Sequence, residues 1–250
     1  MTRGKWQGMM TIARLNWPFY AAAAVVFIGA LGPLAVGSRP DVRLACALAA
    51  VGSGYFLVVS LGVSHLIYDR SDLYRWGWLE RALRGAGKGR FVFCHSGFDE
   101  ASLSLHAHLG QVGWSVLDHF DESRMSEPSI RRARRLFPPV AGTFPAPFDH
   151  WPVASHSVDV IFGLLAIHEL RSETERISWF AEARRCLGEG GRVVLVEHTR
   201  DLANFLAFGP GFFHFHTPAS WRRCWTQAGL RALDEFRLTP WVRVFVIGAP

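Results

Sequence analysis

Cysteine is scarce in this sequence, and its four cysteines stand far apart with no C-x-x-C pair among them. That spacing fits neither a disulfide framework nor a zinc site, and it is compatible with a reducing compartment. We expect buried, inert thiols at all four positions, which are Cys46, Cys94, Cys186 and Cys224.

Charged residues are also few, at 19% of 250 residues, whereas half of the chain is hydrophobic. No dense basic stripe on a recognition fold accompanies the formal charge of +6, so nucleic acid is not expected as a partner. A face that rests on anionic membrane lipid explains this charge more economically. The apolar excess lies between residues 18 and 67, and the rest of the chain has an ordinary composition.

Two uncharged stretches carry that excess. Residues 18–37 are twenty residues without a charge, which at ~1.5 Å per residue span a hydrocarbon core of roughly 30 Å. Residues 44–67 form the second stretch, in which His65 is the only ionisable residue. The six-residue turn between them makes the two helices antiparallel neighbours. The sequence therefore predicts a transmembrane helical hairpin within an N-terminal unit of residues 1–84.

Basic residues flank this hairpin on both outer sides, whereas its turn holds only Arg39 and Arg43. By the positive-inside rule, both termini and the following domain lie in the cytosol, in an integral protein of the inner or cytoplasmic membrane. Residues 68–84 are expected to form an amphipathic juxtamembrane helix along the membrane surface. Tyrosines and tryptophans on both flanks suit an interfacial belt.

Two other interpretations of the apolar stretches are open. Residues 35–37 resemble a signal-peptide cleavage site, but the apolar region is too long for a signal and a second span follows directly. Core helices of a soluble protein would also be apolar, but lengths of 20 and 24 residues favour membrane spans.

Residues 85–250 alternate strand signals with helix signals. Apolar strands that alternate with helices indicate an α/β domain with a mainly parallel sheet covered on both faces. In such sheets, ligands bind beyond the carboxyl ends of the strands. Strands are expected at 90–95, 114–118, 158–167, 192–197, 233–238 and 241–247, and helices at 100–109, 129–137, 173–187 and 218–228.

Three stretches of this domain resemble class I S-adenosylmethionine-dependent methyltransferases, and the ubiquinone/menaquinone-type enzymes in particular. SVDVIF at 157–162, followed by AIHE at 166–169, resembles the fourth strand of that family. Residues 184–197 resemble its fifth helix, turn and fifth strand, and 225–230 its late helix with a following A-G-hydrophobic element. The resemblance covers residues 90–250. It implies a Rossmann-like, mainly parallel sheet of class I methyltransferase type, with S-adenosylmethionine as the cofactor.

One part of the sequence departs from the family pattern. The first strand of the family usually ends in an acidic residue and a glycine-rich loop, whereas here CHSGFDE at 94–100 has a single glycine. Gly97 can still make the tight turn. Asp118 ends the second strand 21 residues after Gly97, where an acid that binds the ribose hydroxyls belongs. The cofactor-binding residues that the resemblance implies are His95, Ser96, Gly97, Asp99, Asp118 and Leu165.

Histidines follow the predicted strand ends, and a histidine of near-neutral pKa suits a general base that removes a proton from the methyl acceptor. His168 and His198 are the first candidates, because strands four and five flank the substrate side in this family. A lid-like stretch, residues 204–216, adds His214 and His216. Each of them could instead be a hydrogen-bonded structural histidine. The candidate catalytic residues are therefore His168, His198 and His214.

Other residues allow weaker interpretations. The pairs His168-Glu169 and Glu197-His198, with Asp99, invite a metal interpretation. They lack regular ligand spacing, and adjacent strand residues point in opposite directions, so no metal site is expected. The phenylalanines of residues 204–215 suit an apolar mouth facing the membrane, or a loop packed on the core. The four arginines within 129–137 could contact lipid phosphates or form a solvated helix face.

Together these features predict a membrane-anchored S-adenosylmethionine-dependent methyltransferase. A bilayer anchor favours a lipophilic small-molecule acceptor such as a quinone, a polyketide or a lipid-like phenol. The rival hypothesis is a non-catalytic methyltransferase-like scaffold or subunit of a membrane protein complex, and the weak glycine loop supports it.

Overall fold

A seven-stranded sheet organises the C-terminal part of the chain in the computed structural model, which describes residues 4–110 and 113–249. The strand order is β3-β2-β1-β4-β5-β7-β6, and β7 runs antiparallel to both of its neighbours whereas the other neighbouring pairs are parallel. This arrangement confirms the predicted mainly parallel α/β sheet. The strands are β1 (Arg90–His95), β2 (Gly113–Asp118), β3 (Thr143–Pro145), β4 (Val158–Leu164), β5 (Leu187–His198), β6 (Arg231–Thr239) and β7 (Val242–Gly248).

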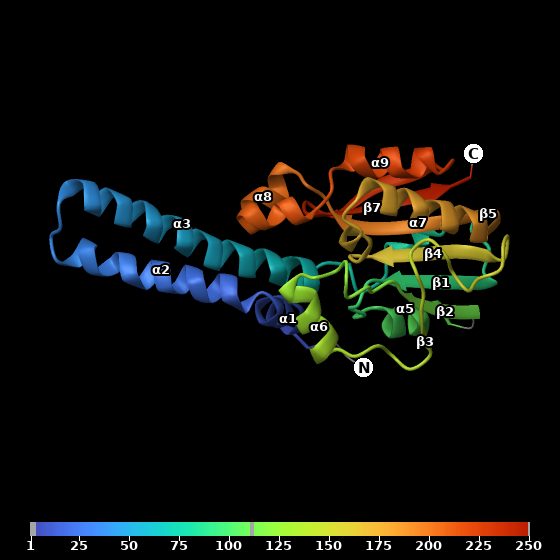
Figure 1. Ribbon diagram of the computed structural model, residues 1–250, viewed down its shortest axis with the longest axis horizontal. Helices are drawn as coiled ribbons and strands as arrows, with labels where there is room; N and C mark the ends of the chain where they lie inside the picture. Colours follow the sequence, from blue (N-terminus) through green and yellow to red (C-terminus); the bar gives the residue numbers. More distant parts are fainter. Residues whose placement is uncertain (1–3, 111–112, 250) are drawn as a thin grey trace.

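Helices and irregular chain cover both faces of this sheet (Figure 1). Successive strand side chains point to opposite faces, so Val92 and Cys94 belong to one buried cluster and Phe91 and Phe93 to the other. The helices of this part are α5 (Ser102–Leu109), α6 (Pro128–Leu136), α7 (Glu173–Cys186), α8 (Leu202–Phe208) and α9 (Pro218–Gln227), with the 3-10 helices η2 (Ile167–Glu169) and η3 (Gly209–His214).

Local sequence signals explain where α7 begins. Ser172 accepts a hydrogen bond from the backbone N–H of Glu175, whose side chain accepts one from the N–H of Ser172 in return. This capping box satisfies two backbone donors that the first helical turn would otherwise leave unpaired. The helix then buries Trp179, Phe180 and Ala183 between the sheet and α9.

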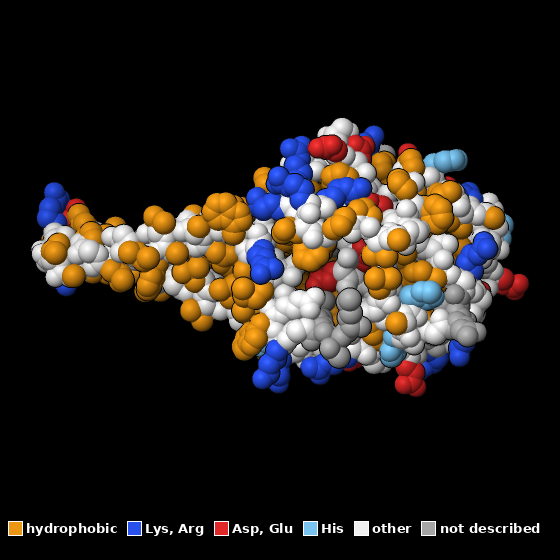
Figure 2. Space-filling view, turned by 90° about the horizontal axis from the view of Figure 1, so that it is seen from below, with side chains coloured by type: hydrophobic (Ala, Val, Ile, Leu, Met, Phe, Trp, Pro, Cys, Tyr) orange, Lys and Arg blue, Asp and Glu red, His pale blue; other side chains and the backbone are white. Residues whose placement is uncertain are grey.

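The N-terminal part is a projecting pair of antiparallel helices, α2 (Trp17–Ala35) and α3 (Pro40–His65), after a short helix α1 (Gln7–Leu15) (Figure 1). Both long helices are apolar and long enough to cross a membrane, by length and composition. They bury little within the chain: Val25, Val51 and Val58 are each at least 70% exposed. Hydrophobic side chains cover the projecting pair, and Lys and Arg side chains gather at its tip and at its base (Figure 2).

The base of the hairpin is fixed to the sheet domain. Asp69 follows α3 in the single π-turn η1 (Leu66–Arg70), and its carboxylate accepts hydrogen bonds from the backbone N–H groups of Gly8 and Met9 in α1. From α6, Arg132 donates to the carbonyl oxygen of Leu15 at the end of α1, at 2.7 Å. These bonds hold the three N-terminal helices at the carboxyl ends of the strands.

The predicted amphipathic helix over residues 68–84 is wrong. After η1 the chain turns, and its only α-helix in the described part of this segment is the short α4 (Leu79–Ala82). Trp76 and Trp78 are buried at 4% and 6% exposure in the cluster that contains Phe91 and Phe162. Side chains assigned to the membrane surface therefore pack on one face of the sheet, because an apolar stripe suits either apolar surface.

Candidate functional site

A cavity of about 990 Å³ lies where the hairpin meets the sheet. One wall comes from the carboxyl ends of β1 and β4 and the residues that follow them. The opposite wall comes from α1, α2 and α3, and η3 closes one side. Apolar side chains dominate the lining, and a few polar groups converge on it, as is usual for small-molecule sites. The polar lining residues include Tyr68, Ser96, Glu127, His168, Glu169, Arg171, His198 and His214.

The end of β4 shapes the reactive wall of this cavity. The predicted strand over 158–167 stops at Leu164, and Leu165 takes a left-handed backbone conformation with φ of 51°. That conformation is strained for a leucine, and such strain is often found at functional sites. The chain then enters η2, so His168 and Glu169 lie in a 3-10 turn and not in a strand.

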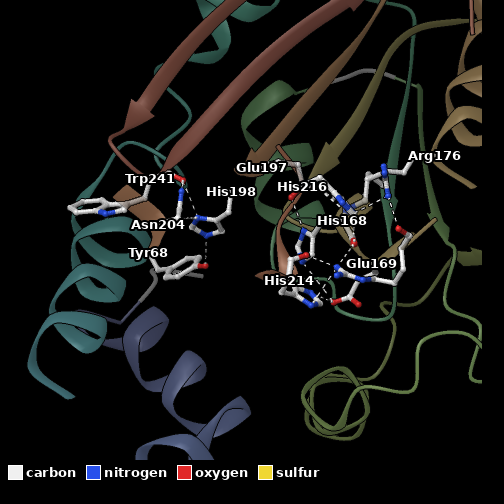
Figure 3. Close-up of polar contacts among 12 residues, drawn as sticks. Tyr68, His168, Glu169, Arg176, Glu197, His198, Asn204, His214, His216 and Trp241 are labelled. Carbon is white, nitrogen blue, oxygen red and sulfur yellow. Dashed lines mark hydrogen bonds and ion pairs between the residues drawn. The ribbon is translucent and has the colours of Figure 1, made fainter. Parts of the chain in front are cut away.

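His168 is held by a buried carboxylate from β5. The Nδ1 atom of His168 lies 2.7 Å from Oε2 of Glu197, which is fully buried and whose other oxygen accepts the N–H groups of Ile167 and His168. Because a carboxylate oxygen accepts hydrogen bonds, Nδ1 of His168 is the donor to Glu197. Nε2 is therefore the ring nitrogen on the side of Glu169, 3.7 Å away (Figure 3).

His214 reaches the same place from η3. Its ring centroid lies 4.9 Å from that of His168, its Nε2 lies 3.4 Å from Glu169, and its Nδ1 donates to Glu127 at 3.0 Å. Burial opposes a charge on this ring, but the hydrogen bonds to Glu127 and Glu169 outweigh burial and raise the pKa of His214 to about 9. In return, the hydrogen bond from His214 lowers the pKa of Glu127. At neutral pH His214 is thus a cation between two carboxylates.

His198 occupies a separate position on the cavity wall (Figure 3). Its Nδ1 donates to the carbonyl oxygen of Trp241, and its Nε2 accepts the Tyr68 hydroxyl at 2.9 Å. Burial lowers the pKa of His198 to about 4. The ring of Phe215 stacks on His198 and also contacts the edge of His168. The structure therefore brings His168 and His214 together, and it gives His198 the full set of partners of a structural histidine.

The remaining histidine of the lid lies deeper. His216 is buried, and Arg176 donates to its Nε2 at 3.0 Å (Figure 3). Burial and this arginine lower the pKa of His216 to about 3. The ring is therefore neutral and helps to satisfy a buried guanidinium.

The residues expected to bind ribose are closed off by the chain itself. Asp118 is 4% exposed, and its carboxylate accepts the N–H groups of Gly97 and Phe120 at 2.8 and 3.0 Å and the Arg134 guanidinium at 2.5 Å. Gly97 has φ of 86°, and a Cβ there would lie 2.6 Å from the ring of Phe120. Arg134 in turn covers that ring, 4.4 Å from its centroid. We call Phe120 and Arg134 the ribose plug.

Several buried polar atoms beside the plug have no partner in the described part of the chain. They are both ring nitrogens of His95, Oγ of Ser96 and Nε2 of His119. Nδ1 of His95 lies 3.4 Å from Asp118 without a hydrogen bond, and burial lowers the pKa of His95. Buried polar atoms without partners are costly and are typical of places where a ligand or water binds.

The other two predicted cofactor residues have clear positions. Asp99 accepts hydrogen bonds from the N–H groups of Ala101 and Ser102 and so holds the chain just before α5. Leu165 lines the cavity, as Ser96 does. Ser96 and Leu165 thus fit S-adenosylmethionine at the open side of the cavity. Asp118 can bind the ribose of the cofactor only if the ribose plug moves aside.

Sequence reasoning missed two contributors to the cavity. Glu127 comes from the loop before α6, and Tyr68 from η1, and neither follows a predicted strand. The local sequence carried no signal for them, since their positions depend on how α6 and the hairpin dock. In the sequence, Glu197 stands out only as the neighbour of His198. In the structure, Glu197 binds His168 instead.

Neither a protein-family model nor a curated protein matches this sequence. The mitomycin 7-O-methyltransferase MmcR is similar in structure, with a TM-score of 0.55, 13% identity, and 99% of this chain and 73% of that chain covered. An S-adenosylmethionine-dependent methyltransferase from Clostridium acetobutylicum gives a TM-score of 0.52 at 8% identity, covering 80% of this chain and 98% of its own. A methyltransferase of the same kind from Aquifex aeolicus gives a TM-score of 0.50 at 14% identity, covering 71% of this chain and 89% of its own.

These similarities define the fold. The sheet domain has the class I methyltransferase fold, as its sequence predicted, and the structural neighbours are S-adenosylmethionine-dependent methyltransferases. At identities this low, the chemistry of this chain has to be argued from its own site.

Proposed function

We propose that this protein is a membrane-anchored S-adenosylmethionine-dependent methyltransferase that acts on a lipophilic acceptor. One observation carries the proposal: the cavity at the strand ends is shared between the hairpin and the methyltransferase fold. Phe19 and Phe56 of the hairpin line the same space as Ser96, Leu165 and His168. An apolar acceptor in the bilayer could reach the reactive wall along α2 and α3 without crossing water.

The membrane anchor is supported by what the hairpin exposes. A core helix of a soluble protein would be mostly buried, whereas 6% and 11% of the apolar windows of these two spans are buried. Exposed apolar side chains on this scale are unfavourable in water and favourable in hydrocarbon. We place both termini and the sheet domain in the cytosol, since Arg39 and Arg43 are the only basic residues of the turn.

Different residues of the chain would bind the cofactor, remove the proton of the acceptor and exclude water during methyl transfer. S-adenosylmethionine supplies an electrophilic methyl group when it is bound. Ser96 and Leu165 would contact it at the cavity, and Asp118 would accept its ribose hydroxyls once the ribose plug opens. The Nε2 lone pair of His168 takes a proton from the acceptor hydroxyl, and Glu197 stabilises the imidazolium that forms. The phenylalanines of η3 exclude water from this step.

A specific observation favours the non-catalytic scaffold as the second candidate. Both oxygens of the Asp118 carboxylate already have donors in this structure, and the Phe120 ring covers the single glycine of the loop. A chain that kept the fold but lost the cofactor would retain such a plug permanently. The two candidates therefore differ in whether the ribose plug can open.

Calorimetric titration of S-adenosylmethionine into the detergent-solubilised full chain separates them. Hydrogen bonds to a charged acceptor contribute ~1.5–3 kcal/mol, so Asp118→Ala should weaken binding by roughly ten- to a hundredfold. Asp121→Ala is the matched control, since the side chain of this acid is 44% exposed and lies three residues away. Absence of a heat or thermal-shift response to millimolar cofactor in the wild-type protein would favour the scaffold.

A further inference from the structure

We propose that His168, Glu169 and His214 form a binding site for a divalent transition-metal cation of the Zn²⁺ class. All three residues line the cavity, and their ligand atoms lie within 4.8 Å of one another. The cation would occupy the space between two imidazole nitrogens and one carboxylate, with a further position open to the cavity. Three protein ligands with one open position are characteristic of catalytic zinc sites.

The distances suit a cation of this size. Metal–nitrogen and metal–oxygen bonds of about 2.0–2.2 Å in tetrahedral geometry separate neighbouring ligand atoms by roughly 3.4 Å. Oε1 of Glu169 lies 3.4 Å from Nε2 of His214 and 3.7 Å from Nε2 of His168. Side-chain shifts would have to bring all three ligand atoms, which lie within 4.8 Å of one another, to this separation.

Each histidine is also oriented by a carboxylate on its far nitrogen. Glu197 holds Nδ1 of His168 at 2.7 Å, and Glu127 holds Nδ1 of His214 at 3.0 Å. A carboxylate behind a ligating histidine fixes its tautomer and raises its basicity, and this arrangement recurs at metal sites. Both histidines have such a carboxylate, and the Nε2 atoms of both face the carboxylate of Glu169 (Figure 3).

The local charge balance also favours a cation. Three carboxylates, those of Glu127, Glu169 and Glu197, surround the two imidazoles. One cation is nearby: the guanidinium of Arg171 donates to the backbone oxygens of His168 and His214 and lies 3.5 Å from Nδ1 of His214. Imidazole and carboxylate ligands together suit Zn²⁺, Fe²⁺ or Co²⁺ better than Mg²⁺ or Ca²⁺, which prefer oxygen-only sites.

The prediction of no metal site assumes strand geometry, which His168 and Glu169 do not have. His168 and Glu169 lie in η2, where consecutive side chains are not forced to opposite faces. The third ligand comes from η3, 45 residues further along the chain, since 214 − 169 = 45. No spacing rule for local motifs would have found it.

The proposed site deepens the proposed function, on which its catalytic meaning rests. With a cation bound, the Nε2 lone pair of His168 is a ligand and no longer the base. A cation here would lower the pKa of an acceptor hydroxyl at the open position, and the released proton would pass to solvent at the mouth of the cavity. A histidine has to be deprotonated at the nitrogen that binds the cation, so acidic buffers should weaken cation binding at this site.

The test is metal binding by the detergent-solubilised full chain, with neither cofactor nor acceptor present. After chelator treatment, ZnCl₂ should bind at one equivalent, measured by calorimetry. CoCl₂ should give the visible absorption bands of a low-symmetry site, and MgCl₂ should not compete. Glu197→Gln should weaken Zn²⁺ binding by roughly 10–100-fold. Glu169→Gln and His214→Ala should weaken it further, because they remove ligands.

Controls make the result decisive. His108→Ala removes an exposed histidine of α5 and should leave Zn²⁺ binding unchanged. Circular dichroism must show each variant folded, and Glu169→Gln, at the cavity surface, tests the site even if Glu197→Gln unfolds. Stoichiometric binding that survives Glu169→Gln and His214→Ala, or the absence of binding to the wild type, would overturn the proposal. Methyl transfer that persists in chelator would leave the proposed function standing without the metal.

Discussion

Replacing Arg134 with alanine should strengthen S-adenosylmethionine binding, because Arg134 holds the ribose plug closed. Its guanidinium bonds Asp118 at 2.5 Å and lies 4.4 Å from the ring centroid of Phe120. A cofactor that needs the open state binds more weakly by the fraction of molecules that are open. Removing the contacts that favour the closed state should recover that loss.

The magnitude follows from the two contacts. The cation–π contact contributes about 0.5–1 kcal/mol at an exposed site. The ion pair contributes about 1–1.5 kcal/mol, a value discounted from that of a buried charged hydrogen bond because the Arg134 side chain is 31% exposed. Their sum of about 2 kcal/mol corresponds to roughly a thirtyfold gain in affinity, at 1.4 kcal/mol for each factor of ten.

Isothermal titration of the cofactor into wild type and Arg134→Ala measures this gain. Arg135→Ala is the matched control, because it removes the same charge from an exposed position of α6. Equal or weaker binding by Arg134→Ala, with Arg135→Ala unchanged, would refute the closed-plug reasoning. It would mean that Arg134 contributes to the bound state or that the plug costs nothing to open.

Four other outcomes are expected. His168→Ala should reduce turnover by ~10²–10⁴-fold while cofactor affinity stays unchanged, and equal turnover at all pH values would exclude this residue from catalysis. The pKa of His214 is raised from 6.5 to about 9 in the folded chain, so its contribution to stability is complete below pH 6.5 and lost as pH rises through 9. Denaturant unfolding at a series of pH values should show this loss of stability, and Glu127→Gln should make the loss smaller. Phe213→Ser, at an exposed ring of the cavity, should raise the Michaelis constant of the acceptor more than it lowers turnover. Reporter fusions at residues 5 and 250 should both report cytosol, and an external signal from either would reverse the orientation.

The sheet strands were predictable because their signals are local and redundant. The runs at 90–95, 114–118 and 192–197 are apolar and bounded by breakers, so both sheet faces had to be covered. The predicted helix at 173–187 matches α7 because a capping box marks its start. The end of the fourth strand was placed three residues too late, at Ile167. Hydrophobicity continues through η2, where the chain is no longer extended but is still buried.

Residues 68–84 show the opposite case. Their tryptophans and tyrosines are compatible with a membrane surface or with a protein core, and both are apolar surfaces beside water. The choice depended on whether the exposed face of β1 and β4 had another cover, which no local pattern records. In the fold, Trp76 and Trp78 provide that cover.

The sequence by itself determined the class of the fold, the two apolar helices, and the strand end at which Asp118 stands. Periodicity, length and breakers act over a few residues, so they can be read in order along the chain. Only the tertiary structure decided which side chains meet. In the fold, His168 contacts Glu197 and His214. His198 accepts a hydrogen bond from Tyr68, and Arg134 forms an ion pair with Asp118. These contacts join segments 16 to 130 residues apart, and they depend on how whole elements pack.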